Sequence, residues 1–256
     1  MSTKNDLFNS LNTLKLSGMT EALEQQFIKK EFTKKSFIER LHHLLEAQVL
    51  WTENRKLELN QKQANLRWPD AAASDIDFDV QKSLDKDEIW NLFEMSWLEV
   101  FENLFLNGPT GSGKTHLACA FGNAAMLLGY KVRFFKYSEL IVTLCKAKRD
   151  DTLDVLYRKL NKIRLFIIDE LRPVELDELE GGLLFDFIES RDLKSSFIFT
   201  SQYPLSDWYD GISDATLADA ILDRVSHNAI TIDMLEKVSL RKVFRGKRQL
   251  GGKDVQ

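Results

Sequence analysis

Cysteine is scarce in this sequence, and long apolar runs are absent. The 256 residues include only two cysteines, Cys119 and Cys145, which lie in helical patterns without metal-ligand spacing. This favours buried or free thiols in a reducing cytoplasm over a disulfide. No run of about 18 apolar residues could span a membrane, and the N-terminus lacks the apolar stretch of a secretory signal. We therefore expect a cytoplasmic protein with no membrane partner.

Charge is nearly balanced over the whole chain but unevenly distributed along it. The net charge of −4 argues against a general nucleic-acid binder. Residues 28–67, however, hold nine Lys or Arg against five Glu, whereas residues 70–102 hold two Lys against ten acids. Residues 240–256 are basic again, with six Lys or Arg against one Asp. The net value therefore averages over distinct acidic and basic regions.

The N-terminal quarter of the chain has helical patterns. Apolar residues recur at helical spacing through the first 67 residues. The stretch "SFIE" is a capping box, with Ser36 as the cap and Glu39 reaching back to it, and it predicts a long helix. We expect this helix to end near Trp68, because Pro69 disfavours the helical conformation of the residue before it.

From about residue 103 the pattern changes to short apolar runs separated by helical segments. The runs are rich in Phe, Ile and Val and lack polar alternation, which is typical of strands buried on both faces of a parallel sheet. They cover residues 103–107, 131–136, 164–169, 196–201 and 228–233. Five such strands with helices between them predict an α/β doubly wound fold.

The stretch "GPTGSGKT" after the first predicted strand fits the phosphate-binding pattern G-x-x-x-x-G-K-[ST] in full. Its glycines allow tight turns that point backbone N–H groups at phosphates, and the following helix adds its positive N-terminus. Lys114 should neutralise the β- and γ-phosphates, and the Thr115 hydroxyl should ligate Mg²⁺. The expected nucleotide contacts are Gly108, Pro109, Thr110, Gly111, Ser112, Gly113, Lys114, Thr115 and His116.

A second motif, "RLFIIDE", ends the third predicted strand with two acids. Asp169 lies where ligands of open α/β sheets bind and can hold Mg²⁺ through water. Glu170 can polarise the attacking water. The combination predicts ATP hydrolysis rather than GTP hydrolysis, because no guanine-reading Asn/Thr-Lys-x-Asp motif occurs. A metabolic P-loop kinase is the least favoured alternative.

Two further stretches carry polar candidates. "FIFTSQYP" ends the fourth strand, where Thr200, Ser201 or Gln202 could touch the γ-phosphate, unless this is an ordinary strand-to-loop transition. "AILDRVSHNAITI" offers Arg224 near the end of a helix. This arginine is either a surface ion-pair residue or a finger that reaches a neighbouring subunit's γ-phosphate. Arg241 is a candidate sensor of the bound nucleotide.

These motifs, together with "LSGMTEAL" near the start and "DATLADAILDRVSHNAI" near the end, resemble the IstB/DnaC group of AAA+ P-loop ATPases, and IstB-type transposition helpers most of all. The resemblance covers nearly the whole chain. It implies Walker A at 108–115, Walker B at Asp169 and Glu170, sensor 1 at Gln202, the finger at Arg224 and a nucleotide contact at Arg241. Sensor 1 usually carries Asn, so Gln202 is one methylene longer. About 23 residues follow the last strand, so we expect no helical lid.

Two regions are candidates for DNA contact. The resemblance implies a helical insertion over residues 137–160, where Lys146, Lys148 and Arg149 cluster at the turn. The alternative is that this turn is only a solvated helical tip. The N-terminal helices supply the second set, Lys29, Lys30, Lys34, Lys35, Arg40, Arg55, Lys56 and Arg67. No nucleic-acid signature occurs there, so contacts should be to phosphates and shape.

The expected function is that of an ATP-dependent regulator of transposition, with ATP and Mg²⁺ as cofactors. It would oligomerise on target duplex DNA with ATP at the subunit junctions, remodel the DNA and recruit an integrase-type transposase, and hydrolysis would disassemble it. On DNA it would be associated with the nucleoid. The alternative is a replicative helicase loader of the DnaC type. The expected parts are a helical DNA- or partner-binding domain (1–68), an acidic connector with a short helix (69–102), the AAA+ domain (103–245) and a flexible basic tail (246–256).

Overall fold

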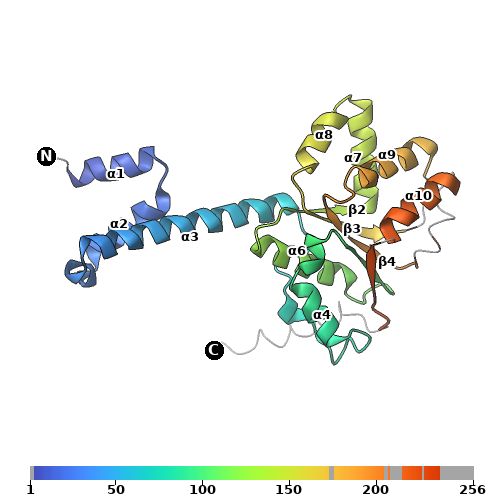
Figure 1. Cartoon of the computed structure of the whole chain (residues 1–256), viewed down its shortest axis with the longest axis horizontal. Coiled ribbons are helices and arrows are strands. Elements are labelled where there is room, and N and C mark those ends of the chain that lie inside the picture. Colours follow the sequence, from blue (N-terminus) through green and yellow to red (C-terminus); the bar gives the residue numbers. More distant parts are fainter. Residues whose placement is uncertain (1–2, 173–175, 205–206, 208–214, 227, 237–256) are drawn as a thin grey trace, which may run out of the picture. The chain divides into compact units, whose positions relative to one another are not determined.

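A computed structural model describes residues 3–172, 176–204, 207, 215–226 and 228–236 of the chain (Figure 1). The chain divides into two compact units, residues 1–60 and residues 61–256. The division falls within one continuous helix. No helix in the described ranges is long and apolar enough to cross a bilayer.

The first unit is helical, as expected from its periodicity. Its elements are α1 (Lys4–Thr13), α2 (Ser17–Ile28), the 3-10 helix η1 (Lys30–Lys34) and α3 (Phe37–Ala64), whose last four residues belong to the second unit. The capping box that starts α3 is present, because the Ser36 amide donates to the Glu39 carboxylate at 2.7 Å and the Glu39 amide donates to the Ser36 hydroxyl at 3.3 Å.

The predicted end of α3 is wrong by four residues. The helix stops at Ala64 instead of near Trp68. Asn65 follows with a φ of +55°, in the left-handed conformation that asparagine tolerates and that commonly terminates helices. A local C-terminal signal therefore ends the helix before Pro69 takes effect.

The second unit contains a five-stranded parallel sheet, as predicted. The strands are β1 (Asn103–Asn107), β2 (Val132–Lys136), β3 (Leu165–Leu171), β4 (Ser196–Ser201) and β5 (Ala229–Asp233). Their order across the sheet is β2-β3-β4-β1-β5, and every recorded pairing is parallel. The carboxyl ends of β1, β3 and β4 therefore lie together at one edge, where the three predicted motifs follow.

Helices cover both faces of this sheet (Figure 1). One face packs against α6 (Lys114–Leu127), which contacts β1, β2, β3 and β4. The other face carries α7 (Tyr137–Arg149), α8 (Leu153–Leu160), α9 (Glu178–Glu189) and α10 (Ala215–Ser226). The core on this second face is rich in aromatic rings, including the stacked pair Phe197 and Phe199. The purely apolar strands are explained by this burial on both sides.

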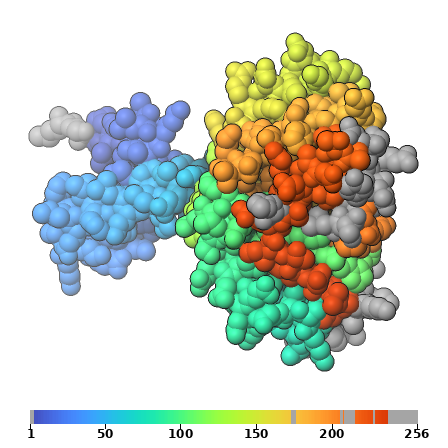
Figure 2. All heavy atoms as spheres, turned by 45° about the vertical axis from the view of Figure 1, so that its right-hand side comes forward, coloured from blue at the N-terminus to red at the C-terminus, as the bar shows by residue number. Residues whose placement is uncertain are grey.

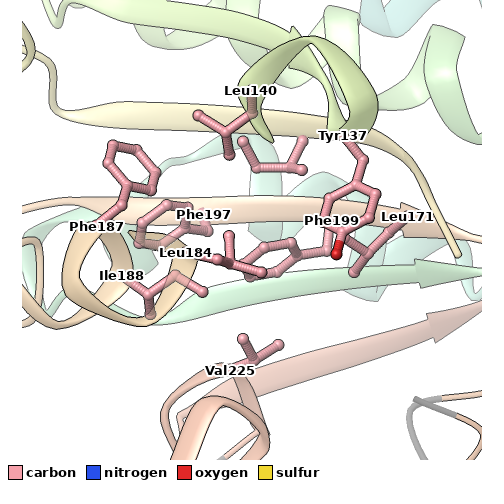
Figure 3. Close-up of a pocket in the computed structure, with 10 residues that line it drawn as sticks. Tyr137, Leu140, Leu171, Leu184, Phe187, Ile188, Phe197, Phe199 and Val225 are labelled. Carbon is pink, nitrogen blue, oxygen red and sulfur yellow. The ribbon is translucent and has the colours of Figure 1, made fainter. Parts of the chain in front are cut away.

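A small cavity remains in the aromatic core (Figure 3). Its walls include Tyr137 and Leu140 from α7, Phe187 from α9 and Val225 from α10. Its volume of about 10 Å³ is at most the space of one water molecule. The wall contains no residue of the phosphate-binding loop. This cavity is therefore a packing defect of the core and not a nucleotide site.

The acidic connector between α3 and β1 is part of the second unit and packs against α6. It contains the 3-10 helix η2 (Ala73–Asp75), α4 (Lys86–Phe93) and the short α5 (Ser96–Glu99). Phe93 and Trp97 pack on Phe121 of α6, with ring centroids 4.3 and 6.5 Å apart. The connector therefore extends the α6 layer, and most of its acids are exposed around this apolar contact.

Candidate functional site

The phosphate-binding loop joins β1 to α6 in the conformation its glycines permit. Gly108 has a φ of +148°, and a Cβ there would lie 2.2 Å from the Met234 carbonyl oxygen. Gly113, which precedes α6, has a φ of +102°. Side chains other than hydrogen are strained at both positions. Lys114 is buried, and its Nζ donates to the carbonyls of Gly108 at 2.5 Å and Pro109 at 2.8 Å.

Asp169, at the end of β3, is fully buried beside this loop. Its Oδ1 accepts a hydrogen bond from the Thr115 hydroxyl at 2.7 Å and another from the Thr200 hydroxyl at 2.6 Å. Buried carboxylates require such partners, because desolvation without them is costly. The two residues predicted as Mg²⁺ ligands, Thr115 and Asp169, are therefore in direct contact.

Glu170 lies in an irregular part of β3. Its φ of +59° is left-handed, and the register between β3 and β4 shifts between Ile168 and Leu171. The Glu170 amide donates to the Thr200 hydroxyl at 3.1 Å. Consecutive side chains of a regular strand point to opposite faces, so this bulge re-aims one of the two acids. Both carboxylates consequently approach the same guanidinium group, that of Arg67.

Arg67 was one of the candidates for DNA contact in the helical region, and in the structure its guanidinium lies against the two acids of β3. Its Nη1 lies 3.0 Å from Glu170 Oε1 and 3.4 Å from Asp169 Oδ2. Burial lowers the pKa of Arg67, but the hydrogen bond to Glu170 and the two negative charges outweigh it and leave the pKa raised. Lys136, at the end of β2, lies 3.9 Å from the other Glu170 oxygen. No local signal in the sequence pointed to either contact.

The three polar residues at the end of β4, Thr200, Ser201 and Gln202, contact different parts of the site. The Thr110 hydroxyl donates to Gln202 Oε1 at 2.6 Å, so the predicted sensor residue contacts the phosphate-binding loop. Thr200 is the member that contacts Asp169 and Glu170, and Ser201 bonds the Leu171 carbonyl. Of these three candidates, Thr200 is therefore the one whose side chain bonds both acidic residues.

The connector passes beside the start of α6. His116 Nε2 lies 3.5 Å from Asp75 Oδ2, and its ring is 6.0 Å from the Trp68 ring. Burial lowers the pKa of His116, and the Asp75 charge opposes this only in part. The buried Gln81 amide donates to the Ser112 carbonyl at 3.0 Å. The connector therefore contributes to the surroundings of the loop, a role that acidic composition alone did not indicate.

Arg224 lies in the last turn of α10. Within the chain its guanidinium pairs with Glu189 of α9 and lies 5.3 Å from the Phe185 ring. Of the two interpretations of the sequence, the surface ion pair is thus seen in a single chain, and a contact with a neighbouring subunit stays a prediction. Arg241 lies outside the described residues.

The basic candidates for DNA contact lie on exposed surfaces of the two units. Lys146, Lys148 and Arg149 are exposed at the end of α7, in the hairpin that α7 forms with α8, seen in yellow at the top of Figure 2. In the first unit, Lys34 and Lys56 are exposed. Lys29, Lys30, Lys35 and Arg55 are exposed as well. Three of the candidates there have partners, because Lys35 lies over the Phe32 ring, Arg40 bonds Gln26 and Arg55 pairs with Glu58.

Comparison with known proteins agrees with this geometry. Residues 9–247 match the family described as IstB-like ATP binding protein. A protein of Sinorhizobium fredii described as an insertion sequence ATP-binding protein is 36% identical over 239 residues, covering 93% of this chain and 97% of its own. An IS21 ATP-binding protein of Pseudomonas aeruginosa is 34% identical over 230 residues, covering 89% and 84%.

Solved structures share the fold at lower identity. DnaA from Aquifex aeolicus with bound AMPPCP has a TM-score of 0.56 at 18% identity, covering 75% of this chain and 58% of its own. The DnaC helicase loader has a TM-score of 0.50 at 20% identity, covering 57% and 86%. Since the family match extends over most of the chain and the phosphate-binding loop faces a pair of strand-end acids, this chain belongs to the IstB-like family of ATP-binding proteins and is an ATPase with an AAA+ P-loop fold.

Proposed function

We propose that this ATPase is a DNA-binding regulator of transposition that assembles on duplex DNA when ATP is bound and leaves it after hydrolysis. The observation that carries the proposal is the similarity to insertion-sequence ATP-binding proteins over 93% of this chain and 97% of the relative. The converging phosphate loop and strand-end acids support the nucleotide part. The partners would be duplex DNA, an integrase-type transposase and further copies of this chain.

ATP would be held by the loop and by α6. Lys114 Nζ now donates to two loop carbonyls, and we expect it to turn to the β- and γ-phosphates when they are present, because charge-assisted bonds are stronger. Gln202, which is bonded to Thr110 of the loop, would detect whether the γ-phosphate is present. His116 and the connector would border the rest of the nucleotide.

The donor set fits Mg²⁺. The Thr115 hydroxyl donates its hydrogen to Asp169. The lone pairs of the hydroxyl oxygen therefore remain available to a hard cation. No group of three or more His, Cys, Asp or Glu side chains that could hold a metal occurs among the described residues. This suits an ion bound by one or two protein oxygens together with phosphates. Bound Mg²⁺ would neutralise charge that develops on the phosphates, while Glu170 orients the attacking water.

DNA contact would use phosphates. The exposed cluster of Lys146, Lys148 and Arg149 in the α7–α8 hairpin is the first candidate, and the exposed lysines of the first unit are the second. Each neutralised phosphate steepens the salt dependence of binding by about 0.9 in log–log slope. Arg224 would act at the junction between subunits, where hydrolysis removes the γ-phosphate that it contacts and so weakens the assembly.

The test images the full-length protein on long duplex DNA with ATP and with a slowly hydrolysed analogue. We expect nucleotide-dependent assemblies, which Glu170→Gln should trap on the DNA. Capture of a replicative helicase without duplex binding would instead support a helicase loader. Glu170→Gln that hydrolyses ATP at the normal rate would refute the role of Glu170.

A charge-reversal experiment tests the hairpin. Reversing Lys146, Lys148 and Arg149 should weaken duplex binding and flatten its salt dependence, with ATP binding unchanged. The matched control makes the same change of charge at exposed lysines elsewhere in the second unit: Lys82, Lys86 and Lys194. Equal loss in both triple variants would show that only net charge matters and would remove the hairpin from the proposal.

A further inference from the structure

Arg67 is held in place by its neighbours along the chain. It lies between α3 and η2, in a stretch whose backbone is bonded to the ATPase core on both sides. Before it, Arg133 of β2 donates to the Gln63 carbonyl at 2.6 Å. After it, the side-chain amide of Asn123 in α6 donates to the carbonyls of Pro69 at 2.9 Å and Ala71 at 2.8 Å. These bonds keep the stretch that carries Arg67 beside the ATPase core in the resting chain.

The guanidinium engages the acid predicted to orient the attacking water. Arg67 Nη1 is 3.0 Å from Glu170 Oε1, and Lys136 Nζ is 3.9 Å from Glu170 Oε2. Each oxygen of this carboxylate thus faces a cation. A carboxylate must present a free oxygen to the water within hydrogen-bond distance in order to orient it. With the oxygen nearer Arg67 engaged in a charge-assisted bond, Glu170 is a poorer acceptor for that water.

The same guanidinium faces the expected metal side of the site. It lies 3.4 Å from Asp169 Oδ2, whereas Asp169 Oδ1 is occupied by the hydroxyls of Thr115 and Thr200. A positive charge this close to a fully buried carboxylate repels a second cation. Arg67 therefore opposes both Mg²⁺ binding and water activation as long as it remains on the two acids.

We propose that Arg67 is a positioning residue that withholds Glu170 from the attacking water in the resting chain and releases it when the stretch after α3 shifts. This rests on the proposed role of Glu170. The stretch is covalently continuous with α3, and most of α3 belongs to the first unit. Binding of duplex DNA to the first unit could thus shift the end of α3, and with it Arg67, away from Glu170.

The first experiment measures steady-state ATP hydrolysis by the full-length protein without DNA. Arg67→Gln should raise kcat a few-fold, up to about fivefold, which is the scale of a partly exposed ion pair, with a smaller change in KM. Duplex DNA should then stimulate hydrolysis less than it stimulates the original protein. Arg67→Lys, which keeps the charge, should stay near the original rate. The matched control is Lys62→Gln, which removes one exposed charge from the last turn of α3 and should change nothing.

Glu170→Gln separates this proposal from the proposed function. Added to Arg67→Gln, it should abolish the gain in rate, because the gain acts through Glu170. If Glu170→Gln alone hydrolyses ATP normally, the role of Glu170 fails. If Glu170→Gln is inactive but Arg67→Gln lowers kcat, Glu170 keeps its role and the withholding role of Arg67 is overturned.

A binding measurement provides a readout that does not depend on turnover. The Mg²⁺ concentration that half-saturates binding of a fluorescent ATP analogue should fall for Arg67→Gln, by up to about fivefold, and should not change for Lys62→Gln. An unchanged Mg²⁺ midpoint together with an unchanged kcat would overturn the proposal. Melting temperatures report folding, and Arg67→Met, which keeps the apolar stem, replaces Arg67→Gln if the latter melts early.

Discussion

Thr200→Val removes one hydroxyl with almost no change in shape. Thr200 is buried, and its hydroxyl donates to Asp169 at 2.6 Å and accepts from the Glu170 amide at 3.1 Å. The loss of a donor to a charged group costs roughly 1.5–3 kcal/mol, and an amide left without an acceptor adds about 1 kcal/mol. The expected loss is about 3 kcal/mol. For a domain of this size that lowers the melting temperature by roughly 6–12 °C.

Thermal melting of the full chain without nucleotide measures this directly. Thr200→Ser is the matched control, because it keeps the hydroxyl and loses one methyl group at a cost of about 1 kcal/mol. Thr200→Val should therefore melt well below Thr200→Ser, and it should also hydrolyse ATP more slowly because Asp169 and Glu170 lose their common support. If the two variants melt together, the hydroxyl bridge contributes little and the reasoning about this unit is wrong.

Three further outcomes are expected. Gly108→Ala should abolish ATP binding in an equilibrium assay, because its Cβ would lie 2.2 Å from a backbone carbonyl oxygen; normal affinity would contradict the close approach. His116 has a lowered pKa, so the unfolded chain takes up its proton first and stability should fall as pH drops below about 6.5. Urea midpoints should show a shallower fall for His116→Gln, because that variant has no imidazole to protonate; an equal fall in both proteins would contradict the effect of burial on this ring. Arg224→Ala should reduce hydrolysis by assemblies on DNA by roughly a thousandfold or more if it is a finger, whereas Glu189→Ala, which breaks the same ion pair, should not; equal effects would leave only a surface ion pair.

The sheet and the phosphate loop could be predicted because their signals are local. Each apolar run became a strand to within two residues of the expected limits, since burial on both faces demands continuous apolar sequence. The loop pattern needs only eight consecutive residues. The end of α3 was missed because the left-handed tendency of Asn65 is a weak signal beside a proline.

The environment of Glu170 could not be predicted in the same way. Arg67 is 103 residues away in sequence, and nothing in its own neighbourhood distinguishes it from the basic residues of the first unit. Thr200 and Gln202 were both candidates at the end of β4, and only the register shift between β3 and β4 decides which of them meets the acids. Such contacts depend on how distant segments pack.

The irregular end of β3 has a consequence for protein design. The two adjacent acids face the same guanidinium only because Glu170 takes a left-handed conformation and its amide is bonded by a side chain of the neighbouring strand. A designer who transplants the seven residues of β3 into another parallel sheet would restore regular alternation and point the acids to opposite faces. The transferable unit therefore spans two strands and must include the hydroxyl of Thr200.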